Sequence, residues 1–191
     1  MLYAYINSWY IYIMNSENKE KFIQKLIPFS LCIFVILADQ ITKVLVVKHI
    51  PPYTILWSFF DDLIRIIHVR NLGSAFSFGH SWPIVLRKIM LVGIPLIVMG
   101  YVVRIYFKSD EFSKLQCWCI SGIIGGGIGN LIDRIFRSEG VVDFIDVKFF
   151  GIFGLDRWPT FNVADAAIVV CGIILIATFI IMIIKDSKRE K

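Results

Sequence analysis

The chain has 191 residues, of which 57% are hydrophobic and only 18% charged, and its formal net charge is +5. A soluble domain of this length has no interior large enough to bury so much apolar surface. No basic stretch is interleaved with aromatic residues on a soluble module, so we also exclude nucleic-acid binding and assign the positive charge to anionic lipid headgroups.

Apolar residues occur in runs of about 20, which is the length that crosses a hydrocarbon core roughly 30 Å thick. The sequence therefore predicts a single polytopic membrane domain. Its expected spans are about 22–47, 83–107, 115–132 and 162–184, with loops at 48–82 and 134–161. We expect an all-α integral membrane protein, a bundle of four transmembrane helices.

Residues 1–21 precede the first expected span and end in the polar run from Asn15 to Lys21. They lack the basic region and the small-residue cleavage site of a signal peptide. Either their aromatic residues lie at a membrane interface, or translation begins at Met14. We expect a chain that starts at Met14 to insert and fold like the full chain.

The first expected span carries Asp39 and Lys43 in its last third. The two are four residues apart with the acid first, which is the favourable order for an ion pair on one helix face. Such a pair can simply limit the cost of two charges at the membrane edge, and it can also orient a neighbouring group.

The loop after this span begins with Pro51 and Pro52, which interrupt a helix. Residues 63–70 then alternate imperfectly and are rich in β-branched side chains, a pattern that predicts a short strand. We expect a small sheet or cradle that lies on the membrane surface.

The second and third expected spans carry recognisable packing signals. Pro95 falls inside the second and predicts a kink. In the third, Gly122, Gly126 and Asn130 recur every four residues. Small residues at this spacing let membrane helices approach closely.

Four spans place both termini on the same side of the membrane. Ten Lys or Arg residues flank the spans on that side and seven lie in the loops on the other. Basic residues favour the cytoplasmic side, so we expect cytoplasmic termini and outward-facing loops, although the bias is modest.

Asp143 follows the third expected span, and Asp165 lies one turn into the fourth. If these helices pack side by side, both carboxyl groups lie at one membrane face. Two close carboxylates do not readily both ionise, so one keeps a proton and the pair can activate water. The alternative is structural: Asn162 caps the fourth helix, Asp165 favours its N-terminal dipole, and Asp143 is an ordinary loop acid.

Asn130, Asp133 and Arg134 share one helix face at the end of the third span. Arg134 either pairs with Asp133 at the membrane border or holds a phosphate or backbone carbonyl of a substrate. A Ser/Lys pair made by Ser74 or Ser77 with Lys43 is a further alternative. The three histidines lack metal-ligand spacing.

Taken together, five ordered motifs resemble those of bacterial lipoprotein signal peptidases (signal peptidase II), aspartic proteases of the inner membrane. The resemblance covers about residues 22–184. The motifs are Asp39-Gln40-x-Thr42-Lys43, Asn71-x-Gly73-x-Ala75-Phe76-Ser77, Gly126-x-x-Gly129-Asn130-x-x-Asp133-Arg134, Val142-Asp143-Phe144 and Phe161-Asn162-x-Ala164-Asp165.

The resemblance implies that Asp143 and Asp165 are a catalytic dyad. It implies a prolipoprotein substrate, cleaved just before a Cys that carries diacylglycerol, and neither metal nor organic cofactor. The residues it places around the dyad are Asn71, Asn130, Arg134 and Asn162 for substrate, with Asp39, Lys43 and Asp133 in support. It also implies an extracytoplasmic β-cradle and an amphipathic helix around residues 55–78, in an inner-membrane protein that we expect to act as a monomer.

Two features depart from the family pattern: residues 1–21 lie outside the match, and the segment 151–157 lengthens the interval between the two aspartates. The rival class is a small transporter or assembly factor. A transporter is expected to carry its acids near mid-membrane, often with an internal repeat. Here the acids cluster at one face and no repeat is visible.

Overall fold

The computed structural model describes residues 16–74 and 78–189. The leader of residues 1–13, Met14 and Ser77 lie outside the described residues. The elements are α2 (Ser16–Leu26), α3 (Phe29–His49), β1 (Ile55–Phe59), β2 (Ile64–Asn71), α4 (Ile84–Lys88), the π-helical η2 (Ile89–Gly93), α5 (Ile94–Lys108), α6 (Lys114–Phe136), β3 (Val141–Ile152), β4 (Leu155–Arg157) and α7 (Val163–Arg189).

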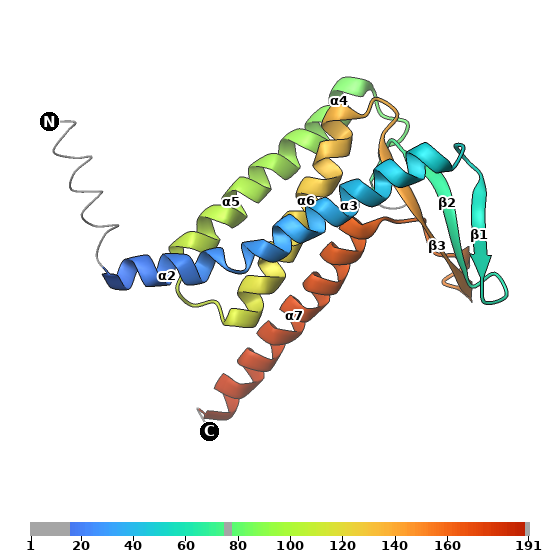
Figure 1. Ribbon diagram of the computed structural model, residues 1–191. Coiled ribbons are helices and arrows are strands. Elements are labelled where there is room, and N and C mark those ends of the chain that lie inside the picture. The colour runs from blue at the N-terminus through green and yellow to red at the C-terminus, as the bar shows by residue number, and fades with distance from the viewer. Residues whose placement is uncertain (1–15, 75–77, 190–191) are drawn as a thin grey trace, which may run out of the picture.

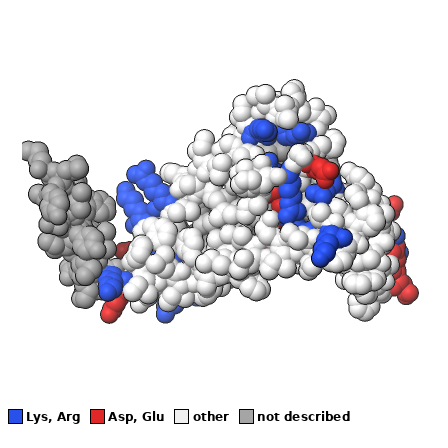
Figure 2. Space-filling view, turned by 45° about the horizontal axis from the view of Figure 1, so that its top comes forward, with Lys and Arg blue, Asp and Glu red and all other residues white. Residues whose placement is uncertain are grey.

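Four helical stretches are long and apolar enough to cross a membrane, at Lys19–His49, Ile84–Lys108, Lys114–Phe136 and Val163–Lys188. On the face shown in Figure 2, charged side chains lie at the end next to the grey leader and over the opposite half of the molecule, and an uncharged belt separates the two groups. This distribution is the one that a hydrocarbon core requires. The predicted set of four apolar helices is therefore confirmed.

The helices are irregular where proline enters them. Pro28, with φ −59°, stands at the N-terminal cap of α3 and separates it from α2. Before Pro95 the helix widens into the π-turn η2, and α5 begins with that proline in its first turn. Proline lacks an N–H and its ring crowds the carbonyl four residues earlier, which a wider turn accommodates. The irregularity expected at Pro95 thus lies in the turn before it.

The sheet has four antiparallel strands in the order β1-β2-β3-β4 and lies beyond one end of the helices (Figure 1). The strand predicted at 63–70 corresponds to β2, which begins and ends one residue later. The loop at 134–161 supplies β3 and β4, so the expected description "all-α" applies to the spans and not to the whole chain. In the described part of 55–78 there are strands and turns, so the amphipathic helix expected there is wrong for those residues.

Helix α6 packs against both α3 and α7. A Cβ at Gly126 would lie 2.4 Å from the backbone O of Ala164 on α7, and one at Gly125 would lie 2.8 Å from the backbone O of Cys32 on α3. Only glycine fits such approaches, so the small-residue pattern in the third span serves close helix packing as predicted. The end of α6 and the start of α7 are thereby held together beside the sheet.

Candidate active site

Both candidate catalytic carboxyl groups lie where the helices meet the sheet. Asp143 is the third residue of β3, its strand position is opposite Val69 of β2, and it is only 3% exposed. Asp165 lies in the first turn of α7 and is half-buried. The structure therefore brings the two acids to one end of the helical bundle, although they lie 22 positions apart in sequence.

Asp165 belongs to a reciprocal cap at the start of α7. The Asp165 backbone N–H donates to Asn162 Oδ1 at 2.9 Å, and the Asn162 N–H donates to Asp165 Oδ2 at 3.2 Å. This is the capping geometry foreseen as the structural alternative. The cap uses only one oxygen of the Asp165 carboxylate. The other, Oδ1, accepts a separate hydrogen bond from Asn130 Nδ2 at 2.7 Å.

Asp143 is held by two amides. Asn162 Nδ2 donates to its Oδ1 at 2.7 Å and Asn71 Nδ2 donates to its Oδ2 at 3.2 Å. The orientation of Asn71 is set by Gly73, whose N–H donates to Asn71 Oδ1 at 2.9 Å. Each oxygen of Asp143 thus has a fixed donor.

A chain of amides connects the two carboxyl groups. Asn162 Nδ2 also donates to Asn130 Oδ1 at 3.1 Å, and Lys43 Nζ donates to the same oxygen at 3.0 Å. With its oxygen accepting twice, Asn130 turns its NH₂ group toward Asp165. In the hydrogen-bond path Asp143–Asn162–Asn130–Asp165, these contacts determine which end of each asparagine amide carries the oxygen and which carries the NH₂ group.

The two acids have unequal surroundings. Burial away from water raises the pKa of the Asp143 carboxyl to about 7, and the negative charge of Asp165 adds to the rise. Hydrogen bonds from Asn71 and Asn162 and the charge of Lys43 oppose it. The geometry and this pKa together suit a pair of acids in which Asp143 holds a proton near neutral pH.

Behind this pair lies a fully buried ionic cluster. Lys43 Nζ is 2.7 Å from Asp39 Oδ2 and 3.0 Å from Asp133 Oδ2, and all three side chains are 0% exposed. Asp39 Oδ1 accepts from the N–H of Ala164 at 3.0 Å, and Asp133 Oδ2 accepts from the N–H of Val142 at 3.1 Å. Asp39 therefore holds the backbone just before Asp165, and Asp133 holds the backbone just before Asp143.

Gln40 completes this cluster; it belongs to the first of the five sequence motifs, but no role was predicted for it. Its Nε2 donates to Asp39 Oδ2 at 3.1 Å, to the carbonyl of Gly129 at 3.0 Å and to Asp133 Oδ1 at 3.1 Å. An amide next to an acid inside an apolar run was the available signal. The same cluster rules out Lys43 as a free base for a serine nucleophile, because its ammonium is already shared among three acceptors.

Arg134 differs from the asparagines because its donors are not all used. Its Nη2 makes one long hydrogen bond of 3.4 Å to the carbonyl of Gly73. Its buried Nε has no partner among the described residues. A buried N–H without an acceptor is costly, so the site leaves hydrogen-bonding capacity at Arg134 that a ligand oxygen can use.

Comparison with known proteins supplies the family. A model of the family Signal peptidase (SPase) II matches residues 31–181. The lipoprotein signal peptidase of Treponema pallidum (strain Nichols) is 52% identical over 157 residues, which are 82% of this chain and 84% of that protein. The lipoprotein signal peptidase of Treponema denticola is 50% identical over 164 residues, 86% of this chain and 94% of that protein.

The fold agrees with solved structures of bacterial membrane enzymes. One has a TM-score of 0.69 at 29% identity, covering 86% of this chain and 91% of the other. A second has a TM-score of 0.67 at 26% identity, covering 80% and 91%. With four apolar helices, the chain is a multi-pass inner-membrane protein and an aspartic endopeptidase, and it belongs to the signal peptidase II family.

Proposed function

We propose that this enzyme cleaves prolipoproteins just before a Cys that carries diacylglycerol, and that Asp143 and Asp165 are its catalytic dyad. The observation that carries the proposal is the continuous hydrogen-bond path between the two carboxyl groups, made by Asn162 and Asn130. Such a path fixes two acids in unequal settings, which is the requirement for sharing one proton.

The proton balance assigns a role to each acid. Protonated Asp143, with its pKa near 7, donates a hydrogen bond to the scissile carbonyl oxygen, and ionised Asp165 takes a proton from the attacking water. The water oxygen bonds to the carbonyl carbon, and the resulting tetrahedral intermediate carries the proton from Asp143. When it collapses, the C–N bond breaks and the proton on Asp165 passes to the amine of the lipidated Cys. One hydroxyl of the intermediate gives its proton back to Asp143, so Asp143 is again protonated and Asp165 again ionised.

Arg134 is the residue that we propose contacts substrate through its unused donors. The charges of Asp143 and Asp165 both act on its guanidinium, and its Nε has no hydrogen-bond acceptor among the described residues. A peptide carbonyl of the substrate would supply one. The amides of Asn71, Asn130 and Asn162 already donate to the carboxylates, so we propose that they serve substrate binding through the acids that they orient.

The membrane positions the substrate in this proposal. Acyl chains on the Cys remain in lipid, which confines the scissile bond to the level where the apolar helices end. The sheet and the dyad both lie at the end of the apolar helices, at the same depth as the scissile bond.

An even number of spans returns the chain to its starting side, so Lys19 and Lys188 lie on the same face of the membrane. The basic residues that flank the spans favour the cytoplasm for that face. The dyad then faces outward, and the sheet serves as the extracytoplasmic cradle.

The decisive experiment is cleavage of a diacylated prolipoprotein by the purified full-length protein. Asp143→Asn and Asp165→Asn should each abolish turnover while the protein remains folded, because removing one member of a dyad costs nearly as much as removing both. Asp156→Asn, an exposed acid on β4, is the matched control and should retain full activity. Substantial turnover by either dyad variant would refute the assignment, and equal cleavage of the unlipidated precursor would refute the substrate.

A further inference from the structure

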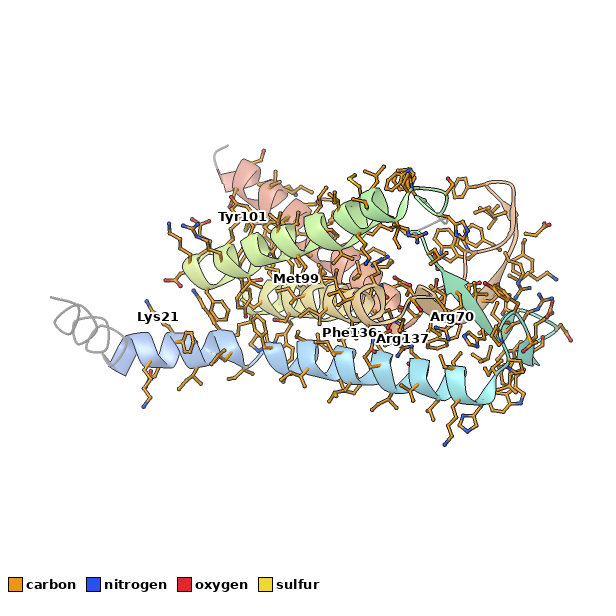
Figure 3. The ribbon with its side chains drawn as sticks, turned by 90° about the horizontal axis from the view of Figure 1, so that it is seen from above. Lys21, Arg70, Met99, Tyr101, Phe136 and Arg137 are labelled. Carbon is orange, nitrogen blue, oxygen red and sulfur yellow. The ribbon has the colours of Figure 1, made fainter. Side chains whose placement is uncertain are left out.

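A second polar site lies between the ends of α3 and α6. It is a groove of about 400 Å³ lined by Lys48, Arg70, Arg137, Glu139 and, on its apolar side, by Val44, Val47 and Phe136. We call it the interhelical groove. Figure 3 shows Phe136 and Arg137 alongside the C-terminal half of α3, with Arg70 on the neighbouring strand β2.

The groove has a surplus of positive charge. Lys48, Arg70 and Arg137 are cationic, and Glu139 is the one acid among its lining residues. Arg70 pairs with Glu139 at 3.2 Å, but the Glu139 side chain is 69% exposed, so solvent weakens that pair. Lys48 is exposed and has no ion-pair partner in the described part of the chain. An anion would be attracted to this groove.

Two guanidinium groups in the groove have buried donors without acceptors. Arg137 uses its Nε on Asp133 at 3.4 Å and its Nη2 on Gln40 at 3.3 Å, but its buried Nη1 has no partner among residues 16–74 and 78–189. The same holds for the buried Nε of Arg70. A group with several oxygens, such as a phosphate, can accept from both.

The position of the groove relative to the membrane indicates which kind of anion it binds. Lys48 is the penultimate residue of α3 and Phe136 is the last residue of α6, so the cations stand where two apolar spans end. Val44 lies one turn deeper and is 54% exposed, while Phe136 is 78% exposed. Basic side chains above an uncovered apolar wall match a lipid headgroup above its acyl chains.

We propose that the interhelical groove binds an anionic membrane phospholipid, with its phosphate on Arg70, Arg137 and Lys48 and one acyl chain along Val44 and Val47. The proposal goes beyond catalysis, since the diacylglyceryl group of the proposed substrate carries no phosphate. An anionic headgroup is favoured over a zwitterionic one because three cations line the groove with one acid, Glu139. The Asp133 carboxylate, which Arg137 also approaches, lies outside the lining and is shared with Lys43.

The test uses native mass spectrometry of the full-length protein in detergent, with phosphatidylglycerol or phosphatidylcholine of the same acyl chains. The wild type should retain phosphatidylglycerol preferentially. Lys48→Gln should weaken that retention about fivefold, the factor that corresponds to one cation near an anionic lipid surface. Lys88→Gln, which removes an exposed lysine at the end of α4 outside the groove, is the matched control and should change nothing.

A thermal arm separates a lipid from a free anion. Phosphatidylglycerol should raise the unfolding temperature of the wild type and raise it less in Lys48→Gln, whereas inorganic phosphate should not raise it. Equal retention of the two lipids, or equal retention by Lys48→Gln and the wild type, would overturn the proposal. An equal stabilisation by inorganic phosphate would overturn the lipid as occupant.

Discussion

Asp143 makes the stability of this enzyme depend on pH in a way that can be measured. Its carboxyl has an ordinary pKa of 3.8, which we take for the unfolded chain, and about 7 in the fold. The folded state binds this proton more tightly than the unfolded state does. The contribution of Asp143 to the free energy of unfolding is therefore fully present below about pH 4 and is lost as the pH rises through about 7.

The size of this effect follows from the same two pKa values. One pKa unit corresponds to about 1.4 kcal/mol, so the whole loss is about 4 kcal/mol. About 2 kcal/mol of it falls between about pH 5.5 and about pH 8.5. For a chain of this length that corresponds to a decrease in unfolding temperature of about 4–8 °C.

Asp143→Asn removes the titrating group and should remove this decrease. At about pH 5.5 the variant should be the less stable protein. Its NH₂ group faces a donor from Asn71 or Asn162, and leaving that buried donor without an acceptor costs about 1–3 kcal/mol. At about pH 8.5 the difference should shrink or reverse, since the wild type then carries a buried charge.

The assay is thermal unfolding of both proteins in one detergent at several pH values, with Asp156→Asn as the control. The quantity of interest is the change of unfolding temperature with pH in each protein. The control should follow the wild type, because its mutated acid is exposed on β4. Parallel pH curves for the wild type and Asp143→Asn would show that Asp143 is ionised in both states and would refute the proton assignment.

Three further predictions concern groups around the dyad. Lys43→Met leaves two buried carboxylates without their cation and should lower the free energy of unfolding by about 3–5 kcal/mol, measured by thermal unfolding. Arg134→Lys keeps the charge but loses the planar fork, so cleavage kinetics should show a marked loss of activity at unchanged expression; wild-type kinetics would reduce Arg134 to a charge at the membrane border. Gly126→Ala should destabilise by about 1–3 kcal/mol because its Cβ would meet α7, whereas Gly172→Ala meets nothing within 4 Å and should not; equal effects would contradict the packing argument.

The four helices could be predicted from sequence because span length and hydropathy are local properties of a segment. The sheet could be predicted only in part. Strand β2 has the β-branched composition of an ordinary strand, whereas five of the first six residues of β3 are buried and two of these are acids, Asp143 and Asp146. Its pairing with β2 joins Asn71 to Val141, seventy residues apart, which no local pattern reveals.

The site shows a similar division. Spacing placed Asp143 and Asp165 near one membrane face, and it offered helix capping by Asn162 as an alternative to chemistry. In the structure Asn162 does both: its Oδ1 caps α7 through the N–H of Asp165, while its Nδ2 donates to Asp143. A sequence pattern cannot show that one amide uses its two ends for different tasks, because that depends on the approach of β3 to the start of α7.

The buried cluster of Lys43, Asp39 and Asp133 explains how these two segments are kept in register. Burying three charges is expensive, and well-packed apolar side chains often give equal stability. Apolar side chains, however, cannot accept hydrogen bonds from the backbone N–H groups of Ala164 and Val142, as the two carboxylates do. Because Lys43 joins both carboxylates and Asn130, a shift of β3 relative to α7 would leave a buried charge unpaired. The cluster thus links the separation of the two acids to the stability of the fold.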